Sequence, residues 1–319
     1  MERSQLIYVV TVAECGSVTR AAEKLHLSQP SLSNQIIHLE QELGIALFAR
    51  VRKRVHLTEA GEVFVRHAQR ILNDMQALAE RMEDYAANRS GRVRIGALPI
   101  MCALHIPELI GGFHSEYPSI TLTLQERGSA ELLQALEQSE IDVAFAILNP
   151  SEPAVGQVHS LPLLQSEICA AVHVDNPLAR RDAIELEQLA DQTLITPNQD
   201  FNLSGIILSH LSSLGISCQV QNICSQIDSC LALVNKNMGI SFCSRASADY
   251  YRYPNVVSVS IKPAISRTVY LVYKKDLAFY PSLQHFVRFA AEFWKTKRYI
   301  IKIFGNGRNP LYFRLFVLK

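Results

Sequence analysis

The first 90 residues carry apolar side chains at helical spacing, in runs that predict three short helices and a longer fourth one. The first helix is expected from Ser4 to Glu14. Ser17 is a suitable N-cap for the second helix. Ser28 is suited to cap the third, in which Pro30 lies in the first turn and loses no hydrogen bond. The third helix should bury an apolar stripe formed by Leu32, Ile36, Leu39 and Leu43.

The remaining faces of the third helix are polar, and basic residues follow it closely. Side chains that donate or accept hydrogen bonds can read base edges in a DNA major groove, and here they are Gln29, Ser31, Ser33, Asn34, Gln35 and His38. Four cations suit DNA phosphates: Arg50, Arg52, Lys53 and Arg54. The net charge of only +1 does not itself indicate nucleic acid, so this cluster beside a polar helix is the more informative signal.

Two stretches together resemble the winged helix-turn-helix of LysR-type transcriptional regulators. They are AAEKLHLSQPSLSNQIIHLEQELGIALFAR at residues 21–50 and HLTEAG at residues 56–61. The resemblance implies DNA contacts from the N-terminal half of the third helix, namely Gln29, Pro30, Ser31, Ser33 and Asn34. Position 34 varies among relatives, so Asn34, which can pair with N6 and N7 of adenine, is the expected base-specific contact. The resemblance also implies a wing over residues 47–57, with its turn expected within Val51–Arg54.

A long amphipathic helix is predicted from Thr58, a suitable N-cap, to Asn88. Its apolar seam is nearly heptad-spaced and comprises Ala60, Phe64, His67, Ile71, Met75, Leu78, Met82 and Tyr85. At a rise of about 1.5 Å per residue, such a helix spans about 46 Å. A seam of that length favours pairing with a second copy of the chain, which would set two DNA-reading heads apart. The alternative is a helix that packs only on its own domain.

From Arg92 the pattern changes to apolar strands that alternate with helical stretches, which predicts α/β lobes on a mostly parallel sheet. Two strands are expected to cross between two lobes, near Ser160–Leu163 and Lys262–Arg267. This part resembles the effector-binding domain of the same family, which is similar in fold to periplasmic binding proteins. The expected organisation is an all-α winged helix-turn-helix domain (1–58), a linker and dimerisation helix (59–90), a two-lobe effector domain (91–295; first lobe 91–161 and 266–295, second lobe 162–265) and a basic tail (296–319).

A small-molecule effector is expected between the lobes, because ligands of open α/β sheets bind at the carboxyl ends of the strands. The residues expected to line this site are Leu98, Ile100, Cys102, Ser129, Thr196 and Phe201. Ser129 is expected to be an N-cap, which would direct free N–H groups at the ligand. Relatives often have Ser or Thr near residues 98–102, where this chain does not. Either the effector is more apolar, or Ser129 and Thr196 hold its polar end.

Several classes of function find little support in the sequence. The chain has no G-x-S-x-G, H-E-x-x-H or Walker motif, so we expect no catalytic residue, no metal and no cofactor. Its seven cysteines form no C-x-x-C pair and are expected to behave as small hydrophobes. Relatives that sense peroxide carry two redox cysteines in the stretch matching residues 195–210, where this chain has none. The apolar run near the N-terminus is too short for a membrane span or a signal peptide, which favours a cytoplasmic protein.

The combined reading is a sequence-specific DNA-binding transcriptional regulator whose activity a small effector of unknown identity modulates. Its expected partners are double-stranded DNA, further copies of the chain in a homodimer or tetramer, and RNA polymerase. The alternative is a solute-binding or enzymatic α/β protein with a helical oligomerisation module. Loss of DNA binding after replacement of the basic cluster at residues 50–54 would distinguish the two.

Overall fold

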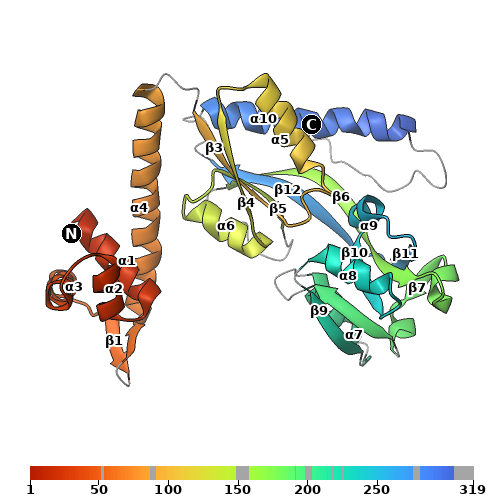
Figure 1. Ribbon diagram of the computed structural model, residues 1–319, viewed down its shortest axis with the longest axis horizontal. Helices are drawn as coiled ribbons and strands as arrows, with labels where there is room; N and C mark the ends of the chain where they lie inside the picture. Colours follow the sequence, from red (N-terminus) through yellow and green to blue (C-terminus); the bar gives the residue numbers. More distant parts are fainter. Residues whose placement is uncertain are drawn as a thin grey trace. The chain divides into compact units, whose positions relative to one another are not determined.

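The computed structural model in Figure 1 describes residues 1–319, except 52–53, 87–90, 149–157, 191, 198–202, 214, 217, 225, 276–280 and 305–319. The chain forms two units that are described separately below. The first comprises Met1–Arg89 with Glu137–Glu140, and the second comprises Ser90–Leu136 with Ile141–Lys319.

The described residues of the first unit form four helices and one β-hairpin. In chain order they are α1 (Arg3–Cys15), α2 (Val18–Lys24), α3 (Gln29–Leu43), β1 (Phe48–Val51), β2 (Arg54–Leu57) and α4 (Glu59–Ala86). The three caps predicted in this unit are confirmed, because each side-chain oxygen accepts a backbone N–H of its helix. Ser17 accepts from Arg20 at 3.4 Å, Ser28 from Ser31 at 3.2 Å and Thr58 from Gly61 at 2.9 Å.

The core of the first unit forms where α3 crosses the other helices. Leu32 and Ile36 of the predicted stripe pack with Ala21 and Ala22 of α2, whose small side chains let the two helices cross closely. The predicted stripe is nevertheless one residue too long, because Leu43 is 40% exposed. Gly44 ends α3 with φ of 69°, a left-handed conformation that favours glycine and turns the chain away after Leu43.

The hairpin is attached to α3 and α4 by a small set of polar and close contacts. One carboxylate oxygen of Glu40 accepts the N–H groups of both Leu47 and Phe48, at 2.7 and 3.0 Å. The Thr58 hydroxyl donates to the carbonyl of Ala46 at 2.8 Å. A Cβ at Gly61 would lie 2.0 Å from the carbonyl oxygen of Leu47, so only glycine allows this approach. These contacts fix where the hairpin leaves the helical core.

The register of the hairpin confirms the expected position of its turn. Val51 pairs with Arg54 and Arg50 pairs with Val55, so the two strands are joined through residues 52–53. Arg52 and Lys53 themselves lie outside the described residues.

The second unit is an α/β structure in which the paired strands form one main path, with β11 and β7 as a branch from β6. Its strands are β3 (Arg92–Ala97), β4 (Thr121–Glu126), β5 (Val143–Ile147), β6 (Val158–His173), β7 (Ala183–Glu185), β8 (Thr193–Pro197), β9 (Gln219–Cys224), β10 (Ile240–Ser244), β11 (Val256–Lys262) and β12 (Ser266–Lys274). Its helices are α5 (Ile106–Glu116), α6 (Ser129–Glu137), α7 (Leu203–Ser213), α8 (Ile227–Val234), α9 (Arg245–Tyr251) and α10 (Pro281–Phe304), with 3₁₀ turns η1 (Pro177–Arg180) and η2 (Leu186–Leu189).

The sheet is mixed, which corrects the expectation of a mostly parallel one. The strand order is β4-β3-β5-β12-β6-β10-β8-β9. β4, β3 and β5 are parallel, and so are β10, β8 and β9, whereas β12 and β6 run antiparallel to their neighbours. Local patterns identify strands but not the direction in which each one pairs, and this explains the error.

The two predicted lobes and their crossing strands are present (Figure 1). The N-terminal part of β6 pairs with β12 in the first lobe, and its C-terminal part pairs with β10 and β11 in the second. The first lobe has one core, which includes Phe113, Phe145 and Phe286. The second lobe has a core on each face of its sheet, one under α7 and one under α8, because successive residues of β6 point to opposite faces.

The basic tail predicted at residues 296–319 is in part helical. α10 continues to Phe304, and residues 305–319 lie outside the described ones. Among the helices that the structure describes, none combines the length and the apolar character needed to cross a lipid bilayer.

The Glu40 contacts lead to a first prediction. Replacing Glu40 with Ala leaves two backbone donors beside the buried Leu47 without an acceptor, which should destabilise the start of the hairpin by about 2 kcal/mol. Hydrogen exchange of the Leu47 and Phe48 amides, followed by mass spectrometry, should then be about 30-fold faster.

Glu42→Ala is the matched control, since Glu42 is an exposed carboxylate on the same helix that pairs with the N-terminal amine. It should leave exchange at Leu47 and Phe48 unchanged. Equal exchange in the Glu40→Ala protein and the wild type would show that the carboxylate does not hold the hairpin.

Candidate nucleic-acid interface and effector site

The predicted reading surface is the solvent-exposed face of α3. Gln29, Pro30, Ser31, Asn34 and His38 are all exposed, as a surface that meets another molecule requires. Ser33 is half-buried, and its hydroxyl accepts a hydrogen bond from the Gln29 amide at 3.0 Å. Gln35 is exposed as well, so α3 presents six of its seven predicted side chains openly and holds the seventh, Ser33, in a local hydrogen bond.

One exposed residue of α3 was absent from the predicted set. Ile37 is 47% exposed although it is apolar, and it lies one turn after Asn34. The sequence does contain a signal for it, because Ile37 falls outside the apolar stripe at 32, 36 and 39. An exposed aliphatic side chain on a groove-reading helix suits contact with the methyl group of thymine.

The basic cluster belongs to the hairpin that follows α3. Arg50 lies in β1 and Arg54 in β2, near the end where the two strands are joined. Glu40 and Thr58 connect this hairpin directly to α3 and α4. The fold therefore places the basic segment on the same rigid scaffold as the reading helix.

The seam of α4 divides into a covered part and an exposed part. Near its N-terminus Phe64 packs on α1, in clusters that contain Leu6, Val9 and Val10. Further along, Ile71, Met75, Leu78 and Met82 are 42–58% exposed. Four large apolar residues at near-heptad spacing on one face of a helix form an unusually hydrophobic exposed stripe.

In the second unit the loops expected to hold a ligand follow the parallel strands of each lobe. In the first lobe, residues 98–102 follow β3, and α6 follows β4. The two are neighbours because β3 lies between β4 and β5. In the second lobe Thr196 lies at the end of β8, beside β10. Ile100 packs against the cores of both lobes, so the loop after β3 meets the second lobe directly.

A group of polar aromatic side chains lies near this loop and was not predicted. Tyr250 lies close to Cys102, and the electrostatic interaction between the two groups is the main cause of the raised pKa of Tyr250. Tyr251 stacks edge-on against Tyr250 with ring centroids 5.1 Å apart. Tyr253 donates to the carboxylate of Asp228 at 2.9 Å. These tyrosines lie in α9 and directly after it, a seven-residue helix whose short sequence gives no periodic signal.

The remaining predicted effector residues have different fates. Ser129 is not an N-cap, because α6 begins at Ser129 itself, and its hydroxyl instead accepts the N–H of Ile147 at the end of β5, at 3.0 Å. Leu98 is 4% exposed in the core of the first lobe, where its role is packing. Thr196 is 6% exposed at the end of β8. Phe201 lies outside the described residues.

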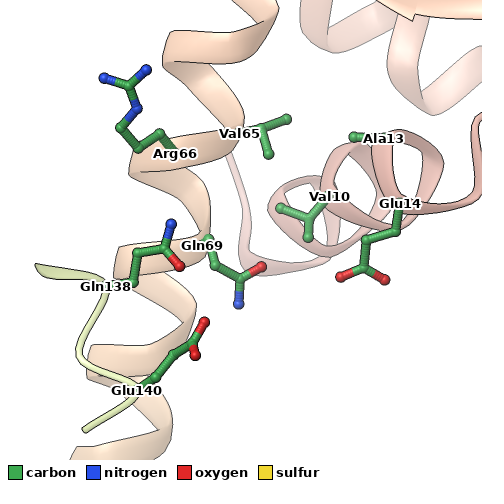
Figure 2. Close-up of a pocket in the computed structure, with 8 residues that line it drawn as sticks. All are labelled: Val10, Ala13, Glu14, Val65, Arg66, Gln69, Gln138 and Glu140. Carbon is green, nitrogen blue, oxygen red and sulfur yellow. The ribbon is translucent and has the colours of Figure 1, made fainter. Parts of the chain in front are cut away.

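The described part of the chain also contains a hollow of about 410 Å³ in the first unit. Figure 2 shows its lining residues, which are Val10, Ala13 and Glu14 of α1, Val65, Arg66 and Gln69 of α4, and Gln138 and Glu140. None of the predicted DNA-binding or effector residues is among them. Within the described residues no three His, Cys, Asp or Glu side chains are arranged to hold a metal ion.

Comparisons with known proteins agree with this architecture. Residues 4–62 match the model of the bacterial regulatory helix-turn-helix proteins of the lysR family, and residues 86–295 match the LysR substrate binding domain. The chain is 28% identical over 277 residues to the DNA-binding transcriptional dual regulator OxyR of Escherichia coli (strain K12), covering 86% of this chain and 90% of that protein.

Solved structures share the fold along most of the chain. Full-length OxyR from Pseudomonas aeruginosa is 25% identical, with a TM-score of 0.59, over 92% of this chain and 95% of that one. CbnR, a LysR family transcriptional regulator, superposes with a TM-score of 0.65 at 23% identity, over 92% of this chain and 99% of that one. The two family models together match most of the sequence, and they match it in the order of the two units of the fold. This chain therefore belongs to the LysR family of bacterial transcriptional regulators.

Proposed function

We propose that this regulator binds specific DNA sites as a homodimer or tetramer and changes its DNA-bound arrangement when a small molecule binds between the two lobes. The observation that carries the proposal is the exposed polar face of α3 beside a basic hairpin, on the same unit as an exposed apolar stripe. The solute-binding or enzymatic alternative explains neither feature. We place the function in the cytoplasm, where bacterial DNA lies, and expect contact with RNA polymerase at promoters.

DNA recognition would divide between α3 and the hairpin. Asn34, with Ser31 and Gln29 one turn earlier, would face base edges in the major groove, and Ile37 would contact a thymine methyl. Arg50, Arg52, Lys53 and Arg54 would contact phosphates, which position the protein but carry little sequence information. The Glu40 bridge supports this division, since it keeps the base-reading helix and the phosphate-binding hairpin in fixed register.

Self-association would bury the exposed stripe of α4 against the same stripe of a second chain. A helix of 28 residues is about 42 Å long at a rise of about 1.5 Å per residue. Pairing along the second half of α4 would leave α1–α3 of each chain accessible, so that α3 could lie in the major groove. A symmetric pair reads two half-sites separated by whole turns of the duplex.

The effector would bind where the loop after β3 meets the second lobe. Ile100 and Cys102 remain candidates there, and Tyr250, Tyr251 and Asp228 are added to them. Ser129 can still donate its hydroxyl hydrogen to a ligand, because the bond with the Ile147 N–H uses only a lone pair of the hydroxyl oxygen. Aromatic walls with a few hydroxyl donors suit a small, partly apolar organic molecule. Such a ligand shifts the arrangement only to the extent that it binds one arrangement more tightly.

Base reading by Asn34 gives a second prediction. Asn34→Ala should weaken binding to a duplex selected by the wild type from a random-sequence pool about 10-fold or more, since a paired base contact contributes about 1–3 kcal/mol. Binding to a scrambled duplex should change little. Gln41→Ala is the control, because Gln41 is exposed on the same face two turns further along α3. Equal losses on both duplexes would refute the base-reading role.

Phosphate contact by the hairpin predicts a different response. Arg54→Ala should weaken binding to the selected and scrambled duplexes alike. The slope of log affinity against log salt should fall by about one, because one fewer phosphate is neutralised. Fluorescence anisotropy at several salt concentrations measures both effects. An unchanged salt slope would remove Arg54 from the phosphate-binding set.

The stripe on α4 gives a prediction about assembly. Leu78→Glu should abolish self-association, because it buries a charge against an apolar partner surface. Light scattering during gel filtration should then give the mass of one chain, 35.7 kDa, instead of a multiple of it. Leu78 is 58% exposed, so the substitution should leave the fold of the single chain intact. Gln76→Glu is the control, because it adds the same charge outside the stripe, and this variant should still form the oligomer. If both variants dissociate, the added charge and not the apolar stripe accounts for the loss of self-association.

A further inference from the structure

Four of the seven cysteines lie together in the second lobe, in the core under α8. Cys169, Cys230 and Cys243 are buried there and Cys224 packs against them. Two of them are direct neighbours on adjacent antiparallel strands, since Cys169 of β6 is the register partner of Cys243 of β10. Their sulfur atoms are 4.0 Å apart, and both are free thiols. The sequence gives no hint of this pair, because the two residues are 74 positions apart.

The backbone places this pair within reach of a disulfide bond. Directly opposed residues of antiparallel strands have Cα atoms about 4.5–5.5 Å apart. Disulfides form at Cα separations of about 4.4–6.8 Å, so no movement of the strands is needed and rotation of the side chains brings the sulfur atoms together. We propose that Cys169 and Cys243 are a modification site, at which a peroxide forms a reversible disulfide between β6 and β10.

The surroundings distinguish the two sulfur atoms. The hydrogen bond with the Cys243 thiol lowers the pKa of Cys169, while the nearby Arg245 guanidinium lowers the pKa of both thiols. The same hydrogen bond, together with burial, raises the pKa of Cys243. Arg245 is held in place by Glu167 at 3.3 Å and Ser260 at 3.1 Å. In the proposed reaction Cys169 is the nucleophile, and Cys243 is the thiol that resolves the intermediate.

The reaction balances with one peroxide molecule. The Cys169 thiolate attacks one oxygen of hydrogen peroxide, the O–O bond breaks, and the sulfur becomes a sulfenic acid while hydroxide takes up a proton to leave as water. Cys243 then loses its proton, its sulfur attacks the sulfur of Cys169, and the S–O bond breaks to release a second water. Two thiols are oxidised by two electrons, and the peroxide is reduced to two waters.

Burial restricts which oxidant can reach Cys169 and Cys243. Cys169 and Cys243 are 0% and 1% exposed, so an oxidant little larger than water can reach them through small fluctuations whereas glutathione disulfide cannot. Burial, followed by the neighbouring Cys224, raises the pKa of Cys230 to about 12, which keeps Cys230 a thiol at neutral pH. The proposed pair also lies outside residues 195–210, so it is a different site from the one expected of peroxide-sensing relatives.

The test uses the full chain and needs no DNA, so it is independent of the proposed function. The folded protein is treated with hydrogen peroxide or with glutathione disulfide, unfolded, alkylated and digested without reductant for mass spectrometry. Peroxide should remove two of the seven alkylatable thiols and give one cross-linked peptide pair containing residues 169 and 243. Dithiothreitol should restore all seven thiols, and glutathione disulfide should remove none within the same time.

Three results would overturn the proposal: seven free thiols after peroxide, a link between Cys224 and Cys230, or oxidation to sulfinic acid without a cross-link. Cys169→Ala and Cys243→Ala should each abolish the cross-linked peptide, whereas Cys102→Ala should keep it. The peptide analysis of the oxidised wild-type protein tests the proposal even if a core variant folds poorly, because it requires no substitution.

Discussion

The second unit depends on one ladder, the antiparallel pairing of β6 with β12. Residues Val158–Glu167 of β6 pair with β12, and the rest of the same strand pairs with β10 and β11. Because β6 is continuous, its backbone transmits any rotation of one lobe to the other. A register shift between Val269 and Tyr270 interrupts the ladder and increases its local twist. In the proposed function, an effector bound between the lobes would act by bending or twisting this pair of strands.

The first unit depends in a comparable way on a single carboxylate. The Glu40 side chain extends from α3 and accepts two backbone N–H groups at the start of the hairpin. Among the described contacts, no other side chain accepts these N–H groups. Thr58 and Gly61 close the same junction from the side of α4. The base-reading helix, the basic hairpin and the helix with the exposed stripe thus meet at one place. Geometry that is fixed there is shared by DNA contact and by assembly.

The sequence could predict the parts of this protein that depend on local signals. Ser17, Ser28 and Thr58 act as caps because a cap needs only its own helix, and Leu32, Ile36 and Leu39 are buried because helical spacing brings them to one face. Features that depend on distant chain segments could not be predicted.

Three such features define the candidate sites. Glu40 meets backbone donors seven and eight residues away, β6 and β12 run antiparallel to their neighbours in the sheet, and Ser129 accepts from Ile147 instead of its own helix. Tyr250 and Tyr251 were missed for a further reason, since a helix as short as α9 contains too few turns to show an apolar period.

Burial and reactivity also have to be separated for the cysteines. Free cysteines without metal or C-x-x-C spacing are expected to be small hydrophobes, and the burial of Cys169 and Cys243 agrees with that. The two thiols are nevertheless neighbours, with sulfur atoms 4.0 Å apart, and their hydrogen bond lowers the pKa of Cys169. Cys169 lies two residues beyond Glu167, the last residue of β6 that pairs with β12. A cross-link to β10 at that point would stiffen β6 beside the crossing ladder, so oxidation and effector binding would act on the same pair of strands.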